Sequence, residues 1–383
     1  MFDLKNCSTL RATISRYLTQ SLNILHISSP FTWRGGEQQL MYLHKGLQGA
    51  GHNSIVFCPN ESVLATRLEI EERVVYNKRS GFDILAAKEL ANYCRLNNVE
   101  VIHAHDAHAH TTSVLAATVF GNKCPIVLSR RVDFPIGGSW FSRYKYNHKR
   151  IKAILCVSNV IRDMVKSKIT AKHVSVATVY SGVDMDKFKG IIPVNLHKEL
   201  GIPSEQKLVA NFSALADHKD YFTFIDTAKI VCGERDDATF LIFGKGELEA
   251  ELREYAKKSG CSDKIRFAGF RNDLPQVYPN INVLLFTSKT EGLGTTVLDA
   301  FASKVPVVAT NGGGIPEMVV HNQTGLMTEV GDANKLAKYV NQVLDDPELG
   351  QKLVDNAFMK CQDFSKENTV MQTQDWYYKV LNN

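Results

Sequence analysis

The sequence predicts an α/β protein built from two doubly wound domains, each with a parallel sheet between layers of helices. Two observations lead to this prediction. Short apolar runs rich in β-branched residues alternate with helical segments over most of the chain, a pattern typical of buried parallel strands. In addition, 383 residues exceed one ordinary hydrophobic core, so the length favours two domains of roughly 150 to 200 residues with a cleft between them.

The expected strands fall into two groups along the chain. The first group is NILHIS (23–28), SIVFC (54–58), VIHAH (101–105), PIVLS (125–129), AILCV (153–157) and VSVATV (174–179). The second group is LVANF (208–212), TFLIFG (239–244), IRFAGF (265–270), VLLFT (283–287) and VPVVAT (305–310). Helices are expected between them, after Gly36, around 86–95, from Thr111 and from about Thr295. Two successive units of one class follow from this alternation.

The domain boundary is expected near SGVDMDKFKGIIPVNLHKELGIP (181–203), where Gly, Asp and Pro interrupt the strand pattern. We therefore assign residues 1–190 to an N-terminal domain and residues 200–364 to a C-terminal domain. Residues 365–383 are expected to form an amphipathic helix that crosses back to the first domain. A weak amphipathic helix with Leu10, Ile14 and Leu18 precedes the first strand, and its place is not predicted.

The composition is that of an ordinary soluble globular protein, with 44% hydrophobic and 22% charged residues. No segment approaches the roughly 18 apolar residues of a membrane-spanning helix. The first 21 residues lack the apolar core of a signal peptide, which predicts a cytoplasmic protein. The eight cysteines form no Cys-x-x-Cys pair and several lie in apolar runs, so free thiols are expected rather than disulfides or metal ligands.

The net charge of +5 is unevenly placed along the chain. Residues 143–172 contain nine Lys or Arg against one acid, Asp163. This basic strip is a candidate contact with the inner face of an anionic membrane, and solvated helix faces are an equal alternative. No nucleic-acid recognition motif accompanies it, so nucleic-acid binding is not expected.

The most informative segment is TSKTEGLGTTVLDAFASKVPVVATNGGGIPE (287–317). After an apolar strand the chain turns through glycines and enters a helix at about Thr295, so that free backbone N–H groups at the helix start suit a diphosphate. Glu291 precedes this helix and Asp299 lies about one turn inside it, and carboxylates accept hydrogen bonds from sugar hydroxyls. A simple helix cap beside an exposed acid is the alternative.

The second half of this segment repeats the order of strand, glycine turn and acidic helix start, ending at Glu317. Two such loops side by side predict a crevice for an anionic ligand. With its other motifs, the sequence resembles the retaining glycosyltransferases of family 4, which have the two-domain GT-B fold. The motifs, within about residues 22–380, are GGEQQL, VYSGVDMDKF, DHKD, LIFGKGELEAEL, IRFAGFRNDLPQVY, TEGLGTTVLDAFA and TNGGGIPEMV.

The resemblance implies that the C-terminal domain binds a nucleoside-diphosphate sugar and the N-terminal domain the acceptor, without a metal or other cofactor. Glu291 is expected to hold hydroxyls of the donor sugar, and Lys219 the donor diphosphate, which makes them the expected catalytic residues. The other expected donor-binding residues are Gly35, Gly36, Gly244, Gly292, Leu293, Gly294, Thr295 and Asp299.

Two positions depart from the family pattern. Asp299 stands where the family has a second glutamate for the ribose, so the carboxylate reaches about one methylene less far. Ala214 stands where an arginine usually grips the diphosphate together with the lysine. Arg130 or Arg131 is a candidate for the missing cation, and a structural pair with Asp133 is the alternative.

Several polar residues of the N-terminal domain are candidates for the acceptor side. They are Glu37, His105, Asp106, Arg130 and Arg131. The segment HAHDAHAHTT (103–112) holds four histidines, but rings on a strand and rings beyond it are not expected to converge on one zinc ion. The basic and aromatic stretch SWFSRYKYNHKRIK (139–152) is a candidate for acceptor or membrane contact, with an ordinary surface as the alternative.

The expected activity is therefore metal-independent hexosyl transfer with retained configuration to a glycan or lipid-linked acceptor of cell-envelope polysaccharide or lipopolysaccharide synthesis. A UDP-sugar is the favoured donor and GDP-mannose the other. A catalytically silent GT-B domain used for binding or assembly is the alternative, because Ala214 and Asp299 depart from the pattern. A nucleotide-dependent oxidoreductase is not expected, because no G-x-G-x-x-G follows the first strand.

Overall fold

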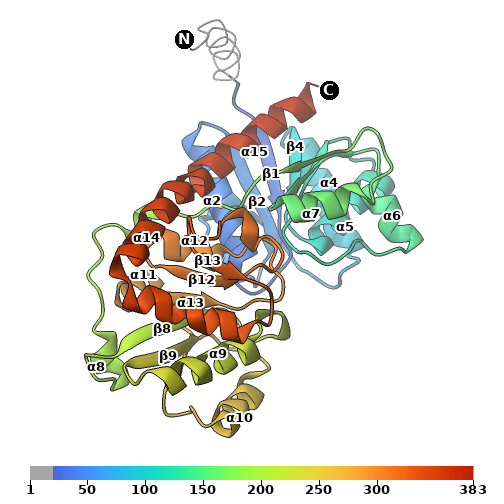
Figure 1. The fold of residues 1–383 in the computed structure, drawn as a ribbon. Helices are drawn as coiled ribbons and strands as arrows, with labels where there is room; N and C mark the ends of the chain where they lie inside the picture. The colour runs from blue at the N-terminus through green and yellow to red at the C-terminus, as the bar shows by residue number, and fades with distance from the viewer. Residues whose placement is uncertain (1–19, 383) are drawn as a thin grey trace, which may run out of the picture.

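A computed structural model describes residues 20–382, which form two α/β domains joined by a linker (Figure 1). Each domain has one parallel sheet with helices on its faces. The fold class predicted from the sequence is thus confirmed. The helix predicted around Leu10, Ile14 and Leu18 lies outside the described residues.

The first sheet has seven parallel strands in the order β3-β2-β1-β4-β5-β6-β7. The strands are β1 (Asn23–Ile27), β2 (Asn53–Pro59), β3 (Arg73–Tyr76), β4 (Val101–Ala104), β5 (Ile126–Arg130), β6 (Ile151–Cys156) and β7 (Ser175–Thr178). The helices are α2 (Gly35–Gly49), α3 (Val63–Thr66), α4 (Ile84–Leu96), α5 (Ala107–Val119), α6 (Trp140–Tyr146) and α7 (Asn159–Lys166). The strand order reverses between β1 and β4, and ligands bind at such points because the flanking loops diverge there.

The second sheet has six strands in the order β10-β9-β8-β11-β12-β13 and reverses between β8 and β11. The strands are β8 (Lys207–Phe212), β9 (Ala238–Phe243), β10 (Ile265–Gly269), β11 (Val283–Phe286), β12 (Val307–Thr310) and β13 (Leu326–Thr328). The helices are α8 (Leu196–Leu200), α9 (Tyr221–Glu234), α10 (Glu249–Ser259), α11 (Leu274–Val277), α12 (Thr295–Ala302), α13 (Ala333–Asp345) and α14 (Pro347–Cys361). The loops after β8 and β11 carry Lys219 and Glu291.

All eleven strands expected from the sequence are confirmed, and the structure adds β3 and β13. Both additional strands lie at sheet edges and have only three or four residues, so neither forms a long apolar run. The helix expected from Thr111 begins earlier, at Ala107. It does so because the Asp106 carboxylate caps it by accepting hydrogen bonds from the backbone N–H groups of His108 and Ala109.

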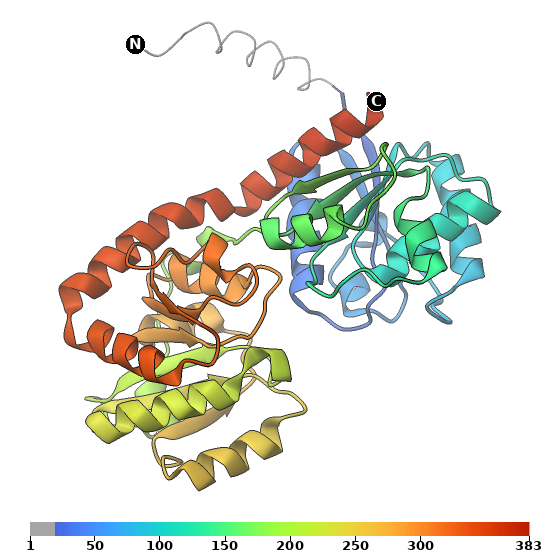
Figure 2. The ribbon, with the colours of Figure 1, turned by 45° about the vertical axis from the view of Figure 1, so that its right-hand side comes forward.

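The last helix, α15 (Lys366–Leu381), follows α14 of the second domain and runs across to the first domain (Figure 2). It packs against α2 and β6 there. Gly46 of α2 makes room for it, since a Cβ atom at this position would overlap the Val370 side chain. Tyr377 is fully buried in this contact, and its hydroxyl lies 2.6 Å from His103 Nδ1. The C-terminal helix is therefore part of the first domain's core.

The seven cysteines among the described residues are all free thiols, and five of them are buried. Within residues 20–382, no helix combines the length and the apolar character needed to cross a bilayer.

Candidate functional site

The two expected catalytic residues meet at the carboxyl edge of the second sheet. Lys219 ends a short 3-10 helix (Asp217–Lys219) after β8, and Glu291 lies in the loop after β11. Lys219 Nζ lies 2.5 Å from Glu291 Oε1, which also accepts a 2.7 Å hydrogen bond from the Ser288 hydroxyl. The two side chains are only 16% and 10% exposed. The carboxylate is thus held by a cation and a hydroxyl on one oxygen, which leaves the other oxygen for a ligand hydroxyl.

Further contacts hold these two loops together. The backbone N–H of Lys289 donates a 2.8 Å hydrogen bond to the carbonyl oxygen of His218. The Lys289 ammonium also pairs with Asp217 at 2.7 Å, in a position open to solvent. The approach of Lys219 to Glu291 is therefore fixed by the backbone of both loops.

The glycine-rich loop after β12 packs against the backbone of Glu291. Gly313 has φ of +60°, and a Cβ atom there would overlap the backbone of Glu291. The N–H of Gly314 donates a 2.9 Å hydrogen bond to the Glu291 carbonyl oxygen. The sequence predicts that these glycines allow a close approach of the backbone. In the structure, the backbone they approach is that of the loop that carries Glu291.

The expected diphosphate-binding residues lie at the start of α12. Gly294 precedes the helix with φ of +92°, and Thr295 begins it. The first amides of a helix have no intrahelical acceptor and carry partial positive charge. Leu293 is 3% exposed, so its side chain belongs to the core and only its backbone is available to a ligand.

Asp299 lies on α12, apart from the Lys219–Glu291 pair, and its carboxylate has no hydrogen-bonded partner among the described residues. Burial raises the pKa of its carboxyl to about 7, against the opposing effect of the Lys187 ammonium. Lys187 in turn donates a 2.7 Å hydrogen bond to the Tyr42 hydroxyl of α2. Asp299 therefore lies on the side of α12 that faces the junction of the two domains.

Gly244 follows β9 and packs on the loop after β8. Its φ is +149°, and a Cβ atom there would overlap the carbonyl oxygen of Ser213. The next residue of that loop is Ala214, the position where the family usually has an arginine. Gly244 therefore shapes the loop that leads to Lys219.

In the first domain, the loops after β1 and β4 face each other. Gly35 and Gly36 open α2, and Glu37 is 6% exposed and accepts a 2.9 Å hydrogen bond from the backbone N–H of Arg34. Burial raises the pKa of the Glu37 carboxyl. Asp106 accepts hydrogen bonds from the Ser29 N–H (2.7 Å) and hydroxyl (2.5 Å), besides capping α5. The carboxylates of Glu37 and Asp106 therefore stabilise the loops after β1 and β4 through these hydrogen bonds.

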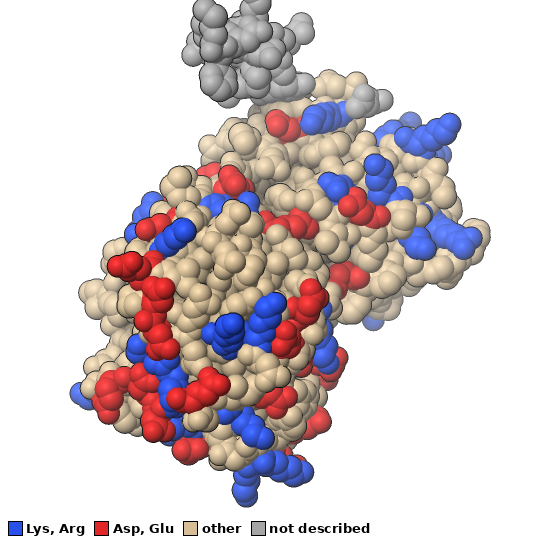
Figure 3. Space-filling view, in the orientation of Figure 1, with Lys and Arg blue, Asp and Glu red and all other residues tan. Residues whose placement is uncertain are grey.

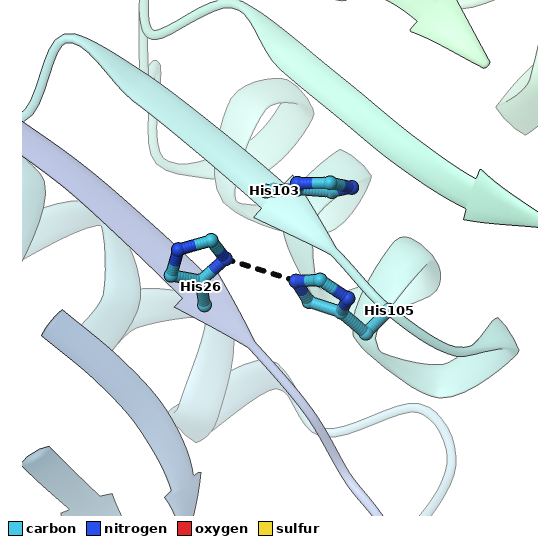
Figure 4. Close-up of side chains that lie close together, drawn as sticks. All are labelled: His26, His103 and His105. Carbon is cyan, nitrogen blue, oxygen red and sulfur yellow. Dashed lines mark hydrogen bonds between the residues drawn. The ribbon is translucent and has the colours of Figure 1, made fainter. Parts of the chain in front are cut away.

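His105 belongs to a buried chain of hydrogen bonds (Figure 4). Its Nδ1 lies 3.0 Å from Arg131 Nη2, and its Nε2 lies 2.9 Å from His26 Nδ1. Because an arginine only donates, His105 Nδ1 accepts and His105 Nε2–H donates to His26. His26 then carries its proton on Nε2, which has no partner among the described residues. These hydrogen bonds hold the guanidinium of Arg131 in place.

One ring nitrogen from each of His26, His103 and His105 lies within 4.8 Å of the other two, an arrangement that could hold a metal ion. His108 and His110 do not join them, so the four histidines of the segment do not converge, but the structure adds His26 from β1. Arg131 already donates to one of these rings. A permanent cation in this place opposes the binding of a second one, so the cluster fits a hydrogen-bonded support better than a metal centre.

A cavity of about 690 Å³ opens beside these residues, over the carboxyl ends of β1, β4 and β5. All five acceptor-side candidates line it: Glu37, His105, Asp106, Arg130 and Arg131. Arg130 donates to the Tyr146 hydroxyl at 3.2 Å and to the carbonyl oxygen of Phe134. Burial lowers the pKa of Arg131 to about 10, against the opposing effect of Glu37.

The two half-sites touch across the domain boundary. Thr290 donates a hydrogen bond to the Asp133 carboxylate, and a Cβ atom on Gly292 would overlap the carbonyl oxygen of Arg131. Among the described residues, Asp133 forms no ion pair with Arg130 or Arg131. Its carboxylate accepts a hydrogen bond from Thr290 instead. The donor loop thus lies directly against the loop after β5.

Glu317 forms a second bridge between the domains, which the sequence does not reveal. Its carboxylate accepts hydrogen bonds from the backbone N–H groups of Asn159 (2.9 Å) and Val160 (3.2 Å) at the start of α7. The Tyr180 hydroxyl donates a third at 2.9 Å. An acid from the second domain therefore caps a helix of the first.

The sequence analysis also missed His26, although its place inside the apolar run NILHIS marks a buried polar residue.

The basic strip, residues 143–172, extends over α6, β6 and α7. Lys and Arg side chains are numerous on the part of the surface that these elements occupy, at the right of Figure 3. The single acid of the strip, Asp163, forms an ion pair with Arg162, with 2.9 Å between Arg162 Nε and Asp163 Oδ1.

Comparison with known proteins agrees with this geometry. Residues 195–359 match the family described as Glycosyl transferases group 1, and residues 33–187 match the one described as Glycosyltransferase Family 4. The N-acetyl-alpha-D-glucosaminyl L-malate synthase of Bacillus anthracis is 27% identical over 78% of this chain and 80% of its own length. The UDP-Gal:alpha-D-GlcNAc-diphosphoundecaprenol alpha-1,3-galactosyltransferase of Escherichia coli is 21% identical over 80% and 87%. The structure of Anabaena HepE with UDP covers 94% of this chain and 100% of its own, with a TM-score of 0.80 and 20% identity, and it confirms the GT-B fold.

Proposed function

This chain belongs to the glycosyltransferases of family 4, and from that premise we propose that it moves a sugar from a nucleoside-diphosphate donor to a glycan or lipid-linked acceptor with retention of configuration. The observation that carries the proposal is the shielded Lys219–Glu291 pair beside the start of α12, at the reversal point of the second sheet. It combines a cation and free amides for phosphate with a carboxylate for sugar hydroxyls.

The proposed reaction breaks the bond between the anomeric carbon and the β-phosphate oxygen and forms one to an acceptor hydroxyl oxygen. Negative charge develops on the departing phosphate, where Lys219 and the α12 amides stabilise it. Glu291 orients the sugar ring, and the acceptor attacks from the face that the phosphate leaves. The proton of the acceptor hydroxyl passes to a phosphate oxygen, so no protein base is required. Contacts across the domain boundary help to exclude water.

A UDP-sugar is the favoured donor and GDP-mannose the other. UDP is bound in the HepE structure, and the E. coli relative is named for UDP-Gal. We place the acceptor in cell-envelope polysaccharide or lipopolysaccharide synthesis, since the name of that relative includes a diphosphoundecaprenol. Residues 143–172 are the proposed peripheral contact with an anionic membrane.

The test is a screen of UDP-, GDP-, ADP- and CMP-sugars with the purified chain, in EDTA and with added Mg²⁺. Binding is measured by calorimetry, slow release of nucleotide by a coupled assay, and the anomer of any product by NMR. We expect one nucleotide sugar to bind and turn over equally in both buffers. Turnover only with Mg²⁺ would overturn the metal-independent mechanism, and no binding by any of them would favour the silent binding module.

Arg131 is the proposed replacement for the missing arginine at Ala214. Its backbone carbonyl lies against Gly292 of the donor loop; the guanidinium of Arg131 is held by His105 and that of Arg130 by Tyr146 and Phe134. We expect Arg131→Gln to weaken nucleotide-sugar binding about 10-fold to 100-fold, the cost of one lost charge-assisted hydrogen bond. Calorimetry with Arg130→Gln as the matched control checks this, since that variant should bind the donor normally. Unchanged affinity in Arg131→Gln contradicts the role.

Asp299 should make donor binding depend on pH. Because burial raises the pKa of its carboxyl to about 7, the group is protonated at pH 6 and ionised at pH 8, and only the ionised form accepts from both ribose hydroxyls. We expect the nucleotide sugar to bind about fivefold more tightly at pH 8 than at pH 6, a modest gain for a hydrogen bond to a charged group. Asp299→Asn should remove this dependence, and an equal pH profile in both proteins would exclude a contact with ribose.

A further inference from the structure

The 690 Å³ cavity of the first domain carries more positive charge than its own acids can neutralise. Its lining includes the cations Arg34, Lys78, Arg130 and Arg131 and the acids Glu37 and Asp106. Glu37 and Asp106 already accept backbone hydrogen bonds that hold the loops after β1 and β4. Among residues 20–382, no carboxylate forms an ion pair with any of the four cations. The cavity is therefore built for an anion.

Arg130 is the cation best placed to hold this anion. Its Nη1 donates to the Tyr146 hydroxyl and its Nη2 to the Phe134 carbonyl oxygen, so the guanidinium is fixed on two sides. Its Nε is buried and has no hydrogen-bond partner among the described residues, and the same holds for the Nε of Arg131, which the proposed function assigns to the donor diphosphate. A buried N–H group without an acceptor is costly, and a ligand oxygen would remove that cost.

Four exposed aromatic side chains belong to segments next to this cavity, and one of them, Phe31, lines it. We call Phe31, Phe82, Phe134 and Trp140 the aromatic rim; their exposed fractions run from 44% for Phe31 to 77% for Trp140. Such large apolar groups seldom gather on a surface without a partner. The aromatic rim thus offers an apolar surface beside an anion site.

Contacts connect the aromatic rim to the cavity. Lys78 lies over the ring of Phe31, and both residues line the cavity. The backbone of Phe134 holds Arg130. Gly81 packs against the ring of His108, which also lines the cavity, so the backbone that leads to Phe82 lies beside the cavity.

The aromatic rim continues into the basic strip. Phe82 lies 4.8 Å from Phe141, measured between ring centroids, and Phe141 follows Trp140 at the start of α6. Trp140 stacks on Tyr144 at 5.6 Å, within residues 143–172. Aromatic rings beside Lys and Arg are the side chains that proteins place at a membrane surface.

We propose that the acceptor is a hydroxyl-bearing group carried on a lipid phosphate, whose phosphate enters the cavity and is bound by Arg130 while its apolar chain lies across the aromatic rim. The assignment of this lipid as the acceptor rests on the proposed function, whereas its binding does not. A soluble phosphate or sugar phosphate shares the charge but not the chain, so it should bind much more weakly. Only the lipid uses both features of the surface.

The test measures binding without turnover. Dodecyl phosphate, kept below its micelle concentration, is titrated by calorimetry into the full chain. The contribution of Trp140 to the fluorescence, taken as the difference from Trp140→Ser because Trp33 and Trp376 also emit, should shift to the blue. Inorganic phosphate and dodecyl maltoside are the probes with only a charge or only a chain. The variants are Arg130→Gln and Trp140→Ser, and the matched controls on the other domain are Arg266→Gln and Phe270→Ser, both at positions away from the cavity.

We expect dodecyl phosphate to bind at least about tenfold more tightly than either other probe. Arg130→Gln should weaken its binding about tenfold and Trp140→Ser about threefold, with no change in the two controls. Equal binding of dodecyl maltoside, or unchanged binding by Arg130→Gln, would overturn the anion site. Equal binding of inorganic phosphate would overturn the lipid.

The donor screen separates this proposal from the proposed function. If the chain binds dodecyl phosphate but no nucleotide sugar, the lipid site is supported and the transferase is not. If it turns over a nucleotide sugar and shows no preference for dodecyl phosphate, the lipid proposal fails alone. Circular dichroism of Arg130→Gln, together with its normal donor binding, confirms that the variant is folded.

Discussion

Replacing Glu291 with glutamine is expected to lower turnover of the nucleotide sugar about 100-fold or more, equivalent to about 2.7 kcal/mol of transition-state stabilisation. The amide keeps the shape of the side chain but loses the charge that pairs with Lys219 at 2.5 Å and that would accept the donor's hydroxyls. Since Lys219 and the α12 amides remain, nucleotide-sugar affinity should change less than about fivefold. Single-turnover kinetics and calorimetry on the same preparation check both parts.

Lys289→Gln is the matched control for this prediction. It removes the exposed ion pair with Asp217 from the same two loops, and exposed pairs contribute about 0 to 1 kcal/mol. Its turnover should stay within about threefold of wild type, because the backbone bond between Lys289 and His218 remains. If Glu291→Gln behaved like Lys289→Gln, Glu291 would have no part in the chemistry.

The second large effect is a loss of stability in mild acid. Burial strongly lowers the pKa of five histidines of the first domain, to about 4 for His44 and about 3 for His110, and it lowers the pKa of His52 and His148 as well. The five are His26, His44, His103, His105 and His110. As the pH falls below about 6.5, these rings take up fewer protons in the folded protein than in the unfolded chain, so stability falls with the pH.

The magnitude follows from proton linkage. His44 and His110, with pKa values of about 4 and about 3, each cost roughly 1 to 1.5 kcal/mol at pH 5.5, about one unit below the ordinary pKa of histidine, and the three other rings act in the same direction. The sum is a sizeable fraction of the stability of a typical domain. Urea unfolding at pH 7.5, 6.5 and 5.5 should show this decline.

Variants assign the decline to the buried rings. His110→Gln should reduce the slope of unfolding free energy against pH by about 1.4 kcal/mol per unit between pH 6 and 5, because one proton fewer is taken up on unfolding. His108→Gln, at an exposed neighbouring position, should leave the slope unchanged. Equal slopes in both variants would mean that other groups cause the acid sensitivity.

The sequence alone determined the fold class, eleven of the thirteen strands and the family, because apolar periodicity and ordered glycine motifs are local properties of the chain. It also predicted that Lys219 and Glu291, 72 residues apart, act on one ligand, and the structure brings Lys219 Nζ to 2.5 Å from Glu291 Oε1. It missed β3 and β13, which are too short and too near the sheet edges to produce a long apolar run.

Only the tertiary structure decided which side chains share an environment. His26 and His105 are 79 residues apart, and they meet because β1 and β4 are neighbours in the sheet. Glu317 caps α7 and Thr290 holds Asp133 only once the two domains are in contact. The unpaired Nε of Arg130 is likewise a property of burial. Hydrogen bonding and desolvation depend on distances in space, and a pattern along the chain does not carry those distances.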